Sequence, residues 1–337
     1  MDTKIYQADE LSEAVAAIKA GQLVAFPTET VYGLGADAQN EAAVKQVYAA
    51  KGRPSDNPLI VHVSSFEQVK AFVDNFPVIT EKLVETFWPG PLTLIFPIKP
   101  GTLPAVVTGG LSTAAFRMPN NKKTLALIAQ SGRPIVGPSA NTSGKPSPTT
   151  AEHVYHDLKG KIAGVLDDGS TEIGVESTVL DLSQAVPMIL RPGAITEEAL
   201  AAVIGPVAID GHLVSAEEVP KAPGMKYRHY APQVPVQIVE GADWQAALAW
   251  AAARQQRPGI LADQAVIAAF PAVPHFELTT DNDVATAAQR LFAGLRYFDE
   301  QPIDVLFVQG FAEQGMGVAY MNRLKKAASG NFFTSGT

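Results

Sequence analysis

The chain has 337 residues, 47% of them hydrophobic and only 18% charged, so it is long and apolar enough to exceed one typical hydrophobic core. It contains no cysteine, which excludes disulfides, thiol catalysis and cysteine-ligated zinc. The formal net charge of −8 argues against non-specific nucleic-acid binding, so we expect no stable complex with nucleic acid. No apolar run approaches the roughly 20 residues that span a bilayer, and no export signal follows Met1. The sequence therefore predicts a cytoplasmic protein without membrane contact.

The first two hundred residues mix strand and helix patterns in an irregular order. Helices are predicted over 12–20, 40–51 and 78–87, and strands over 23–26, 59–63, 92–96, 135–136, 175–182 and 188–190. Asn40 is suited to cap the second helix, and Gly21 and Gly52 follow the first two helices at the usual position for a left-handed residue. The last two strands are expected to pair antiparallel. This pattern predicts an α/β domain with a twisted mixed sheet over residues 1–210.

The composition changes after about residue 205. Residues 217–235 hold four prolines and the basic-aromatic cluster 226–230, which is typical of an interdomain linker, and we place the linker at 211–235. Beyond it, strands and helices alternate. Strands are predicted over 236–239, 259–261 and 305–308, and helices over 244–254, 284–298 and 321–328. This alternation predicts a small Rossmann-like domain with a parallel sheet over residues 236–337.

Residues 33–38 (GLGADA) match the G-x-G-x-x-A dinucleotide pattern. That mechanism requires the glycines to join a strand directly to a helix. Here the preceding strand ends at Pro27 and the next helix starts near Asn40, so we interpret the glycines as loop residues. The chain also has no Walker-type phosphate loop.

Two other segments are suited to bind an anion. In 51–58 (KGRPSDNP), a helix end accounts for Lys51 and Gly52 but leaves Arg53 and Asn57 without a structural role, and two prolines stiffen the turn. In 137–148 (GPSANTSGKPSP), hydroxyl and backbone N–H groups follow a strand end, where they are suited to phosphate oxygens. A third polar loop, 28–33, also follows a strand, a common position for ligands in α/β sheets.

Seven segments in this order resemble the YrdC-like threonylcarbamoyl-AMP synthases. They are 28–34, 51–54, 57–62, 88–93, 138–141, 176–179 and 191–193. The segment 223–232 and the additional domain are similar to the long, two-domain branch of that family. The resemblance implies an L-threonylcarbamoyladenylate synthase, which makes threonylcarbamoyl-AMP and pyrophosphate from ATP, L-threonine and bicarbonate. A downstream transferase would then move the threonylcarbamoyl group to an adenosine of tRNA.

The resemblance also implies roles for individual residues. Lys51 and Arg53 would be catalytic, balancing the charge of the triphosphate. Arg117 would bind the threonine carboxylate, while Thr30, His62 and Ser177 orient the amine and hydroxyl. The residues implied in ATP binding are Arg53, Asn57, Thr113, Ser139, Asn141, Ser147, Arg191 and Tyr230. Mg²⁺ would be carried by the ATP phosphates, because no cage of Asp and Glu is evident.

We further hypothesise that residues 226–230 close over the nucleotide as a lid that protects a labile adenylate. Two other functions remain open at this point. One is carbamoyl transfer from carbamoyl phosphate, as in hydrogenase maturation proteins, which carry zinc-finger cysteines that this chain lacks. The other is a double-stranded RNA-binding module, which the net charge disfavours. The C-terminal domain could in addition be a regulatory or interaction module.

Overall fold

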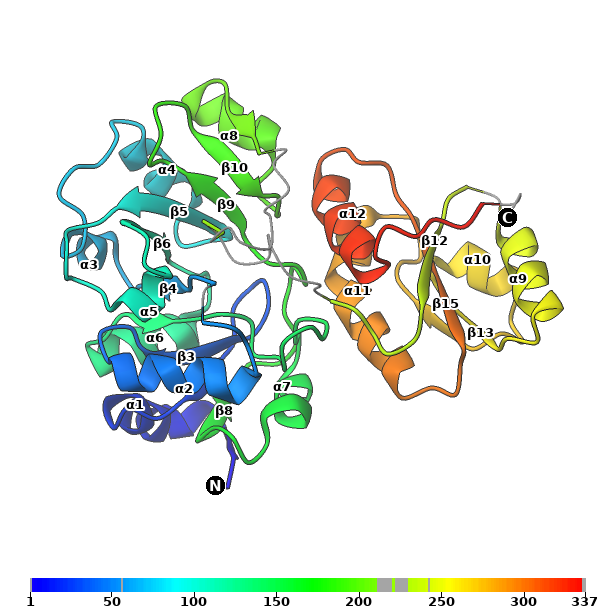
Figure 1. Cartoon of the computed structure of the whole chain (residues 1–337), viewed down its shortest axis with the longest axis horizontal. Helices are drawn as coiled ribbons and strands as arrows, with labels where there is room; N and C mark the ends of the chain where they lie inside the picture. The colour runs from blue at the N-terminus through cyan, green and yellow to red at the C-terminus, as the bar shows by residue number, and fades with distance from the viewer. Residues whose placement is uncertain (1, 56, 211–219, 222–229, 242, 335–337) are drawn as a thin grey trace. The chain divides into compact units, whose positions relative to one another are not determined.

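The computed structural model describes residues 2–55, 57–210, 220–221, 230–241 and 243–334 (Figure 1). The chain divides into two compact units. The first comprises Met1–Ser143, Pro148–Glu172 and Glu176–Tyr227, and the second comprises Gly144–Ser147, Ile173–Val175 and Arg228–Thr337. Most of the predicted linker, including residues 226–229 of the predicted lid, lies outside the described residues.

The first unit contains one mixed sheet with parallel and antiparallel neighbours, as predicted. In the described residues its order is β1-β8-β2-β3-β7-β4-β6-β5-β9-β10-β11. The strands are β1 (Lys4–Tyr6), β2 (Val24–Phe26), β3 (Gly33–Asp37), β4 (Ile60–His62), β5 (Leu92–Pro97), β6 (Thr113–Arg117), β7 (Ile135–Val136), β8 (Gly164–Leu166), β9 (Thr178–Asp181), β10 (Met188–Arg191) and β11 (Ala208–Ile209). The predicted antiparallel pairing of β9 with β10 is confirmed.

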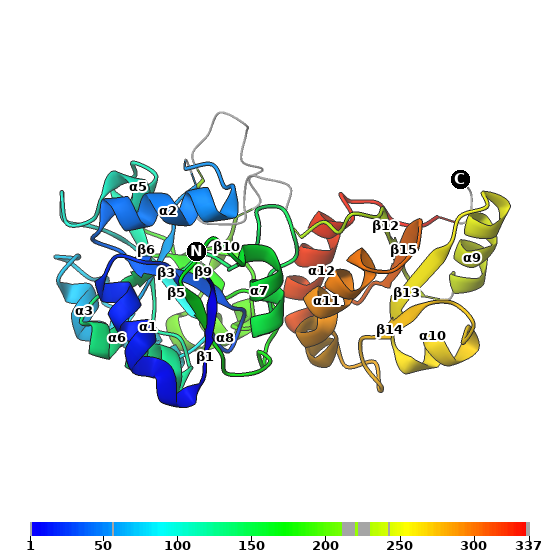
Figure 2. The ribbon, with the colours of Figure 1, turned by 90° about the horizontal axis from the view of Figure 1, so that it is seen from below.

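The helices of the first unit cover both faces of this sheet. They are η1 (Ala8–Glu10), α1 (Leu11–Lys19), α2 (Glu41–Lys51), α3 (Phe66–Lys70), α4 (Thr80–Phe87), α5 (Ala105–Thr108), α6 (Lys122–Ser131), α7 (Ala151–Leu158) and α8 (Glu197–Ile204). Figure 2 shows α2 and α5 on one side of the sheet, and α1 and α6 on the other. Asn40 caps α2 by accepting from the Ala43 N–H, and Gly52 ends it with φ +63°, as the sequence predicted.

Side-chain alternation along the central strands separates two different surfaces. On one face, Val61, Leu94, Phe116 and Leu180 join the large buried core under α2, α4 and α5. On the other face, a smaller cluster consists of Ile60, Ile95, Ala115 and Val179, with Leu190 beside it. All the described members of this smaller cluster belong to strands, and none belongs to a helix. We therefore expect polar side chains to share this part of the sheet face.

The interpretation of residues 33–38 as loop was wrong, because Gly33–Asp37 forms the buried strand β3 between β2 and β7. The glycines are required by close packing. A Cβ on Gly33 would lie 2.6 Å from the Phe26 ring, and one on Gly35 would lie 2.7 Å from the Val24 carbonyl oxygen. Glycine therefore serves close approach of neighbouring strands here.

The second unit contains a four-stranded sheet whose strands are all parallel, which confirms the predicted C-terminal architecture. Its order is β12-β15-β13-β14, and its strands are β12 (Val236–Val239), β13 (Pro258–Ala262), β14 (His275–Glu277) and β15 (Val305–Gln309). Its helices are α9 (Trp244–Ala253), α10 (Gln264–Ala269), α11 (Val284–Asp299) and α12 (Met316–Ala327). Helix α12 starts five residues before the predicted position. No described helix of the chain is long and apolar enough to cross a membrane.

Candidate active site

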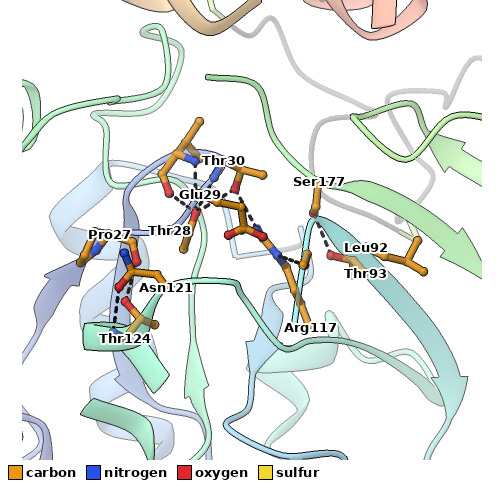
Figure 3. A network of polar contacts seen from close by, with 12 residues as sticks. Pro27, Thr28, Glu29, Thr30, Leu92, Thr93, Arg117, Asn121, Thr124 and Ser177 are labelled. Carbon is orange, nitrogen blue, oxygen red and sulfur yellow. Dashed lines mark hydrogen bonds and ion pairs between the residues drawn. The ribbon is translucent and has the colours of Figure 1, made fainter. Parts of the chain in front are cut away.

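The polar side chains of the site lie on the sheet face that carries the Ile60 cluster. His62 follows Ile60 by two positions on β4, and Arg117 follows Ala115 by two on β6, so each pair shares a face. Thr93 precedes Ile95 on β5 in the same way, and Ser177 stands just before β9. His62 and Arg117 are register partners at the ends of parallel strands. Figure 3 shows Arg117, Thr93 and Ser177 converging from these strands.

Arg117 makes three kinds of contact although it is almost completely buried. Its Nη1 donates to the Thr30 hydroxyl at 2.9 Å, and its Nη2 lies 2.7 Å from a carboxylate oxygen of Glu29. Its Nε donates to the Gly90 carbonyl at 3.3 Å. These contacts fix the orientation of the guanidinium, which has five N–H groups in total. The group is therefore rigidly placed while part of its donor capacity remains for a ligand.

The loop after β2 presents Thr30 and Glu29 to Arg117 because Thr28 folds it into a tight turn. The Thr28 hydroxyl donates to the Val31 carbonyl at 2.6 Å and accepts from the Thr30 N–H at 3.1 Å. The two threonine hydroxyls are 2.8 Å apart. The Thr124 hydroxyl, in the first turn of α6, donates to the Pro27 carbonyl and fastens the start of the loop (Figure 3).

Ser177 joins β5 to Arg191. Its hydroxyl lies 2.8 Å from the Thr93 hydroxyl and accepts from Arg191 Nη2 at 3.1 Å. Arg191 Nε also donates to the Ser177 carbonyl at 3.0 Å. All three residues are buried, so Arg191 is held at the same sheet face as Arg117. The predicted threonine-binding and nucleotide-binding residues therefore meet at Ser177.

His62 is buried and neutral at ordinary pH. Burial, and then the positive charge of Arg117, hold the pKa of His62 well below its usual 6.5. Its ring packs edge-on against Phe26 at 5.2 Å, and a Cβ on Gly137 would lie 2.6 Å from it. The Nδ1 atom has no hydrogen-bond partner among the described residues. A buried ring nitrogen of this kind is suited to a polar group of a ligand.

Lys51 and the loop after β7 form a second cluster. The Lys51 ammonium donates to the Ser139 carbonyl, to the Asn141 carbonyl at 2.8 Å and to the Asn141 side-chain oxygen at 3.4 Å. The Ser139 hydroxyl also donates to that side-chain oxygen, at 2.6 Å. Lys51 is 2% exposed, so its charge is buried beneath the loop that it holds in shape. The sequence did not indicate this fastening role.

Arg53 and Asn57 lie in the turn that follows α2, a few residues after Lys51. Asn57 is fully buried, and neither polar atom of its side-chain amide has a hydrogen-bond partner among the described residues. Arg53 Nη2 donates weakly to the Pro58 carbonyl at 3.4 Å. Thr113 starts β6, on the same face as Ala115 and Arg117. A buried, unpartnered amide is costly, so Asn57 is poised for a ligand.

Two predicted nucleotide-binding residues belong to the second unit. Ser147 lies in the Gly144–Ser147 segment and is fully buried. Tyr230 is 5% exposed, has φ +64° and packs on the Phe292 ring at 4.9 Å. The lid stays a prediction, since residues 226–229 lie outside the described part of the chain.

Three members of the site were not assigned from the sequence. Glu29 forms the ion pair with Arg117, Thr28 shapes the loop, and Thr93 contacts Ser177. Each lies within a segment that carried the family resemblance, 28–34 or 88–93. A buried carboxylate beside an arginine is a spatial relationship across 88 positions, which spacing along the chain does not reveal.

Two family models together match most of the chain. The model described as Telomere recombination matches residues 16–193, and the Threonylcarbamoyl-AMP synthase C-terminal domain matches residues 195–329. The chain belongs to the threonylcarbamoyl-AMP synthase family, in its two-domain form. It is accordingly an enzyme of the nucleotidyltransferase type.

Individual relatives agree over nearly the whole length. The threonylcarbamoyl-AMP synthase of Bacillus subtilis is 48% identical over 95% of this chain and 93% of its own. That of Pyrococcus abyssi is 46% identical over 94% and 93%. The crystal structure of P. abyssi Sua5 complexed with L-threonine matches with a TM-score of 0.92 and 44% identity, covering 98% of this chain and 99% of that one. This similarity confirms the predicted fold class.

Proposed function

We propose that the chain makes threonylcarbamoyl-AMP and pyrophosphate from L-threonine, bicarbonate and ATP, for the modification of tRNA. The observation that carries the proposal is the buried cluster of Arg117, Thr30, His62 and Ser177 beside an apolar sheet surface. Threonine combines a carboxylate, an amine, a hydroxyl and a methyl group. A guanidinium, hydroxyls, a neutral imidazole and an apolar floor match these groups one for one.

In the proposed reaction, the threonine amine and bicarbonate give a carbamate with loss of water. A carbamate oxygen then bonds to the α-phosphorus of ATP, and the bond to the pyrophosphate oxygen breaks. Chemistry of this kind needs alignment and charge neutralisation more than an acid–base pair. Arg117 would hold the carboxylate, and Arg191 would face the phosphates from across Ser177, to which both its Nε and Nη2 are fixed.

The nucleotide site is proposed at the loop after β7 and the turn after α2. Ser139 and Asn141 lie in a loop fastened by Lys51, whose buried charge gives this region a positive potential. The unpartnered Asn57 amide and Arg53 would complete it, with Thr113 at the start of β6. Lys51 and Arg53 remain the proposed catalytic cations, and Ser147 and Tyr230 remain predicted contacts of the nucleotide.

Mg²⁺ would accompany ATP. Among the described residues, no group of three or more His, Asp or Glu side chains is placed to hold a metal ion, so the donor set does not form a cage of its own. We therefore leave the ion on the phosphate oxygens. The product would pass to a tRNA threonylcarbamoyl transferase, and we place this sequence of reactions in the cytoplasm.

The decisive experiment measures pyrophosphate release from ATP by the full chain, with threonine and bicarbonate omitted in turn. We expect release to require both, and threonylcarbamoyl-AMP to appear in a one-to-one ratio with pyrophosphate. Serine and alanine in place of threonine test the match of the hydroxyl and methyl groups. Pyrophosphate release that ignores both omissions would contradict the proposal.

A further inference from the structure

The parallel sheet of the second unit reverses the direction of its connections around β15. Strands β12 and β13 lead into α9 and α10, whose Trp244, Ala247 and Val266 pack with Ile260 and Ala262 on one face. Helix α11 packs on the opposite face, where a Cβ on Gly294 would meet Leu261. Figure 1 shows α12, which follows β15, on that face with α11. In parallel α/β sheets, ligands bind beyond the carboxyl ends of neighbouring strands whose connections leave on opposite faces.

A cavity of about 440 Å³ lies at this position, within the second unit. Its walls come from the carboxyl ends of the three strands: Gly241 and Trp244 after β12, Asp263 and Val266 after β13, and residues 309–312 at the end of β15. Asn282, in the loop before α11, closes the remaining side. The volume falls in the range of small-molecule sites, about 300–1,000 Å³.

The polar wall is prearranged by hydrogen bonds between loops. The Gln309 amide nitrogen donates to an Asp263 carboxylate oxygen at 3.1 Å and to the Asn282 side-chain oxygen at 2.9 Å. The Asp263 N–H donates back to the Gln309 side-chain oxygen at 2.7 Å. Asn282 holds a left-handed φ of +60°, a conformation that costs free energy and that this network stabilises. The three side chains therefore face the cavity in fixed orientations before any ligand arrives.

The side chains that line the cavity limit which kinds of ligand can bind there. Asp263 is the single charged residue of the described lining, which holds no lysine, arginine or histidine to neutralise a phosphate. Its carboxylate stands at the carboxyl end of β13, and in dinucleotide-binding α/β folds an acidic side chain at a strand end accepts a hydrogen bond from a ribose 2′-hydroxyl. One carboxylate oxygen of Asp263 already accepts from the Val266 N–H and the other from Gln309, and each keeps a lone pair for a ribose hydroxyl. Phe311 supplies aromatic surface for a flat ring, Trp244 adds only the 5% of its surface that stays exposed, and Asn282 supplies an amide for the polar edge of the ring.

We propose that this cavity of the C-terminal domain binds a ribonucleoside without phosphate groups, its vicinal hydroxyls on Asp263 and its base toward Trp244 and Phe311. The lining of this cavity shares no residue with the proposed catalytic cluster. Failure of this proposal would leave the proposed function untouched.

Adenosine is the probe, and hydrogen–deuterium exchange of the full chain is the readout, because exchange assigns binding to a segment even if adenosine also occupies the first unit. We expect millimolar adenosine to slow exchange in residues 243–248, 263–268 and 309–316. We expect 2′,3′-dideoxyadenosine to bind at least about tenfold more weakly, as loss of hydrogen bonds to a charged group requires.

Single substitutions test which residues of the cavity bind adenosine. Asp263→Asn keeps a good cap for α10 and should weaken adenosine protection at least about tenfold. Asp304→Asn, in the same unit but paired with Arg257 outside the cavity, should leave it unchanged. Ala312→Trp adds bulk at an exposed wall position and should abolish protection without entering the core. No protection by adenosine, equal protection by the dideoxy compound, or protection by L-threonine instead would overturn the proposal.

Discussion

The Arg117 guanidinium and the Glu29 carboxylate lie 2.7 Å apart, with side chains only 5% and 3% exposed. Removal of one partner leaves a buried charge without its counterion. We expect Arg117→Ala to lower the free energy of unfolding by about 3–5 kcal/mol. Urea denaturation measures it. Lys123→Met, which removes a more exposed ion pair with Asp168, should cost about 1 kcal/mol or less.

The double variant Arg117→Met with Glu29→Gln separates the ion pair from simple loss of packing. Because both charges are then absent, we expect it to be more stable than Arg117→Ala alone. A double variant that is as unstable as the sum of the two single changes would show that the pair is not energetically coupled.

Arg117→Lys tests the proposed role in threonine binding. Lysine keeps the positive charge but loses the planar fork that binds a carboxylate through two N–H groups. We expect the KM for threonine in pyrophosphate release to rise at least about tenfold. The KM for ATP should change by less than about twofold, since the guanidinium faces the proposed amino-acid site. Equal increases in both constants would instead indicate a general loss of structure.

Lys51→Met tests the fastening of the Ser139 loop. The change removes the Lys51 donor from one buried and one partly buried backbone carbonyl, so we expect a loss of about 1.5–3 kcal/mol in the free energy of unfolding. The matched control is Lys45→Met on the same helix, whose exposed ammonium pairs with Glu41 and should contribute about 0.5 kcal/mol or less. Similar destabilisation by both variants would refute a special role for Lys51.

His62 makes stability depend on pH in one direction. Its pKa is lower in the folded chain than the 6.5 of an unfolded histidine, so the unfolded state binds more protons below pH 6.5. Its contribution to stability is complete above that pH and is lost as the pH falls, by at most about 1.4 kcal/mol per pH unit. We expect His62→Gln to reduce the slope of unfolding free energy between pH 6.5 and 5 by up to one proton. An unchanged slope would mean that His62 binds as many protons in the folded chain as in the unfolded chain, so that its pKa is not lowered by folding.

Local signals predicted those parts of the fold that neighbouring residues determine. Asn40 and Gly52 fixed both ends of α2, and apolar runs located β4, β5 and β9. Strand order could not be predicted, because β5 pairs with β9 across more than 80 positions and no local pattern records such a contact. The three-residue strands β1 and β8 were not predicted, because segments this short carry little periodicity of their own.

The candidate site could be proposed from the sequence as a set of residues but not as an arrangement. The family resemblance identified Arg117, Thr30 and Ser177, and the structure brings them onto one sheet face. It did not identify Glu29, since a buried carboxylate is indistinguishable in sequence from an exposed one until its partner is located. The internal hydrogen bonds of Lys51 were hidden for the same reason: its acceptors are carbonyls 88 and 90 positions away.

Gly33 marks the place where sequence reasoning failed, and a single substitution tests the reason. If the glycine served a loop conformation, alanine would be tolerated there. In β3, a Cβ at this position would lie 2.6 Å from the ring of Phe26, which is itself fully buried and cannot move aside. We expect Gly33→Ala to cost about 1–3 kcal/mol in urea denaturation. Phe26→Leu, destabilising on its own, should remove part of that cost in the double variant, since the smaller side chain leaves space for the new methyl group. Strictly additive effects of the two changes would contradict the packing explanation.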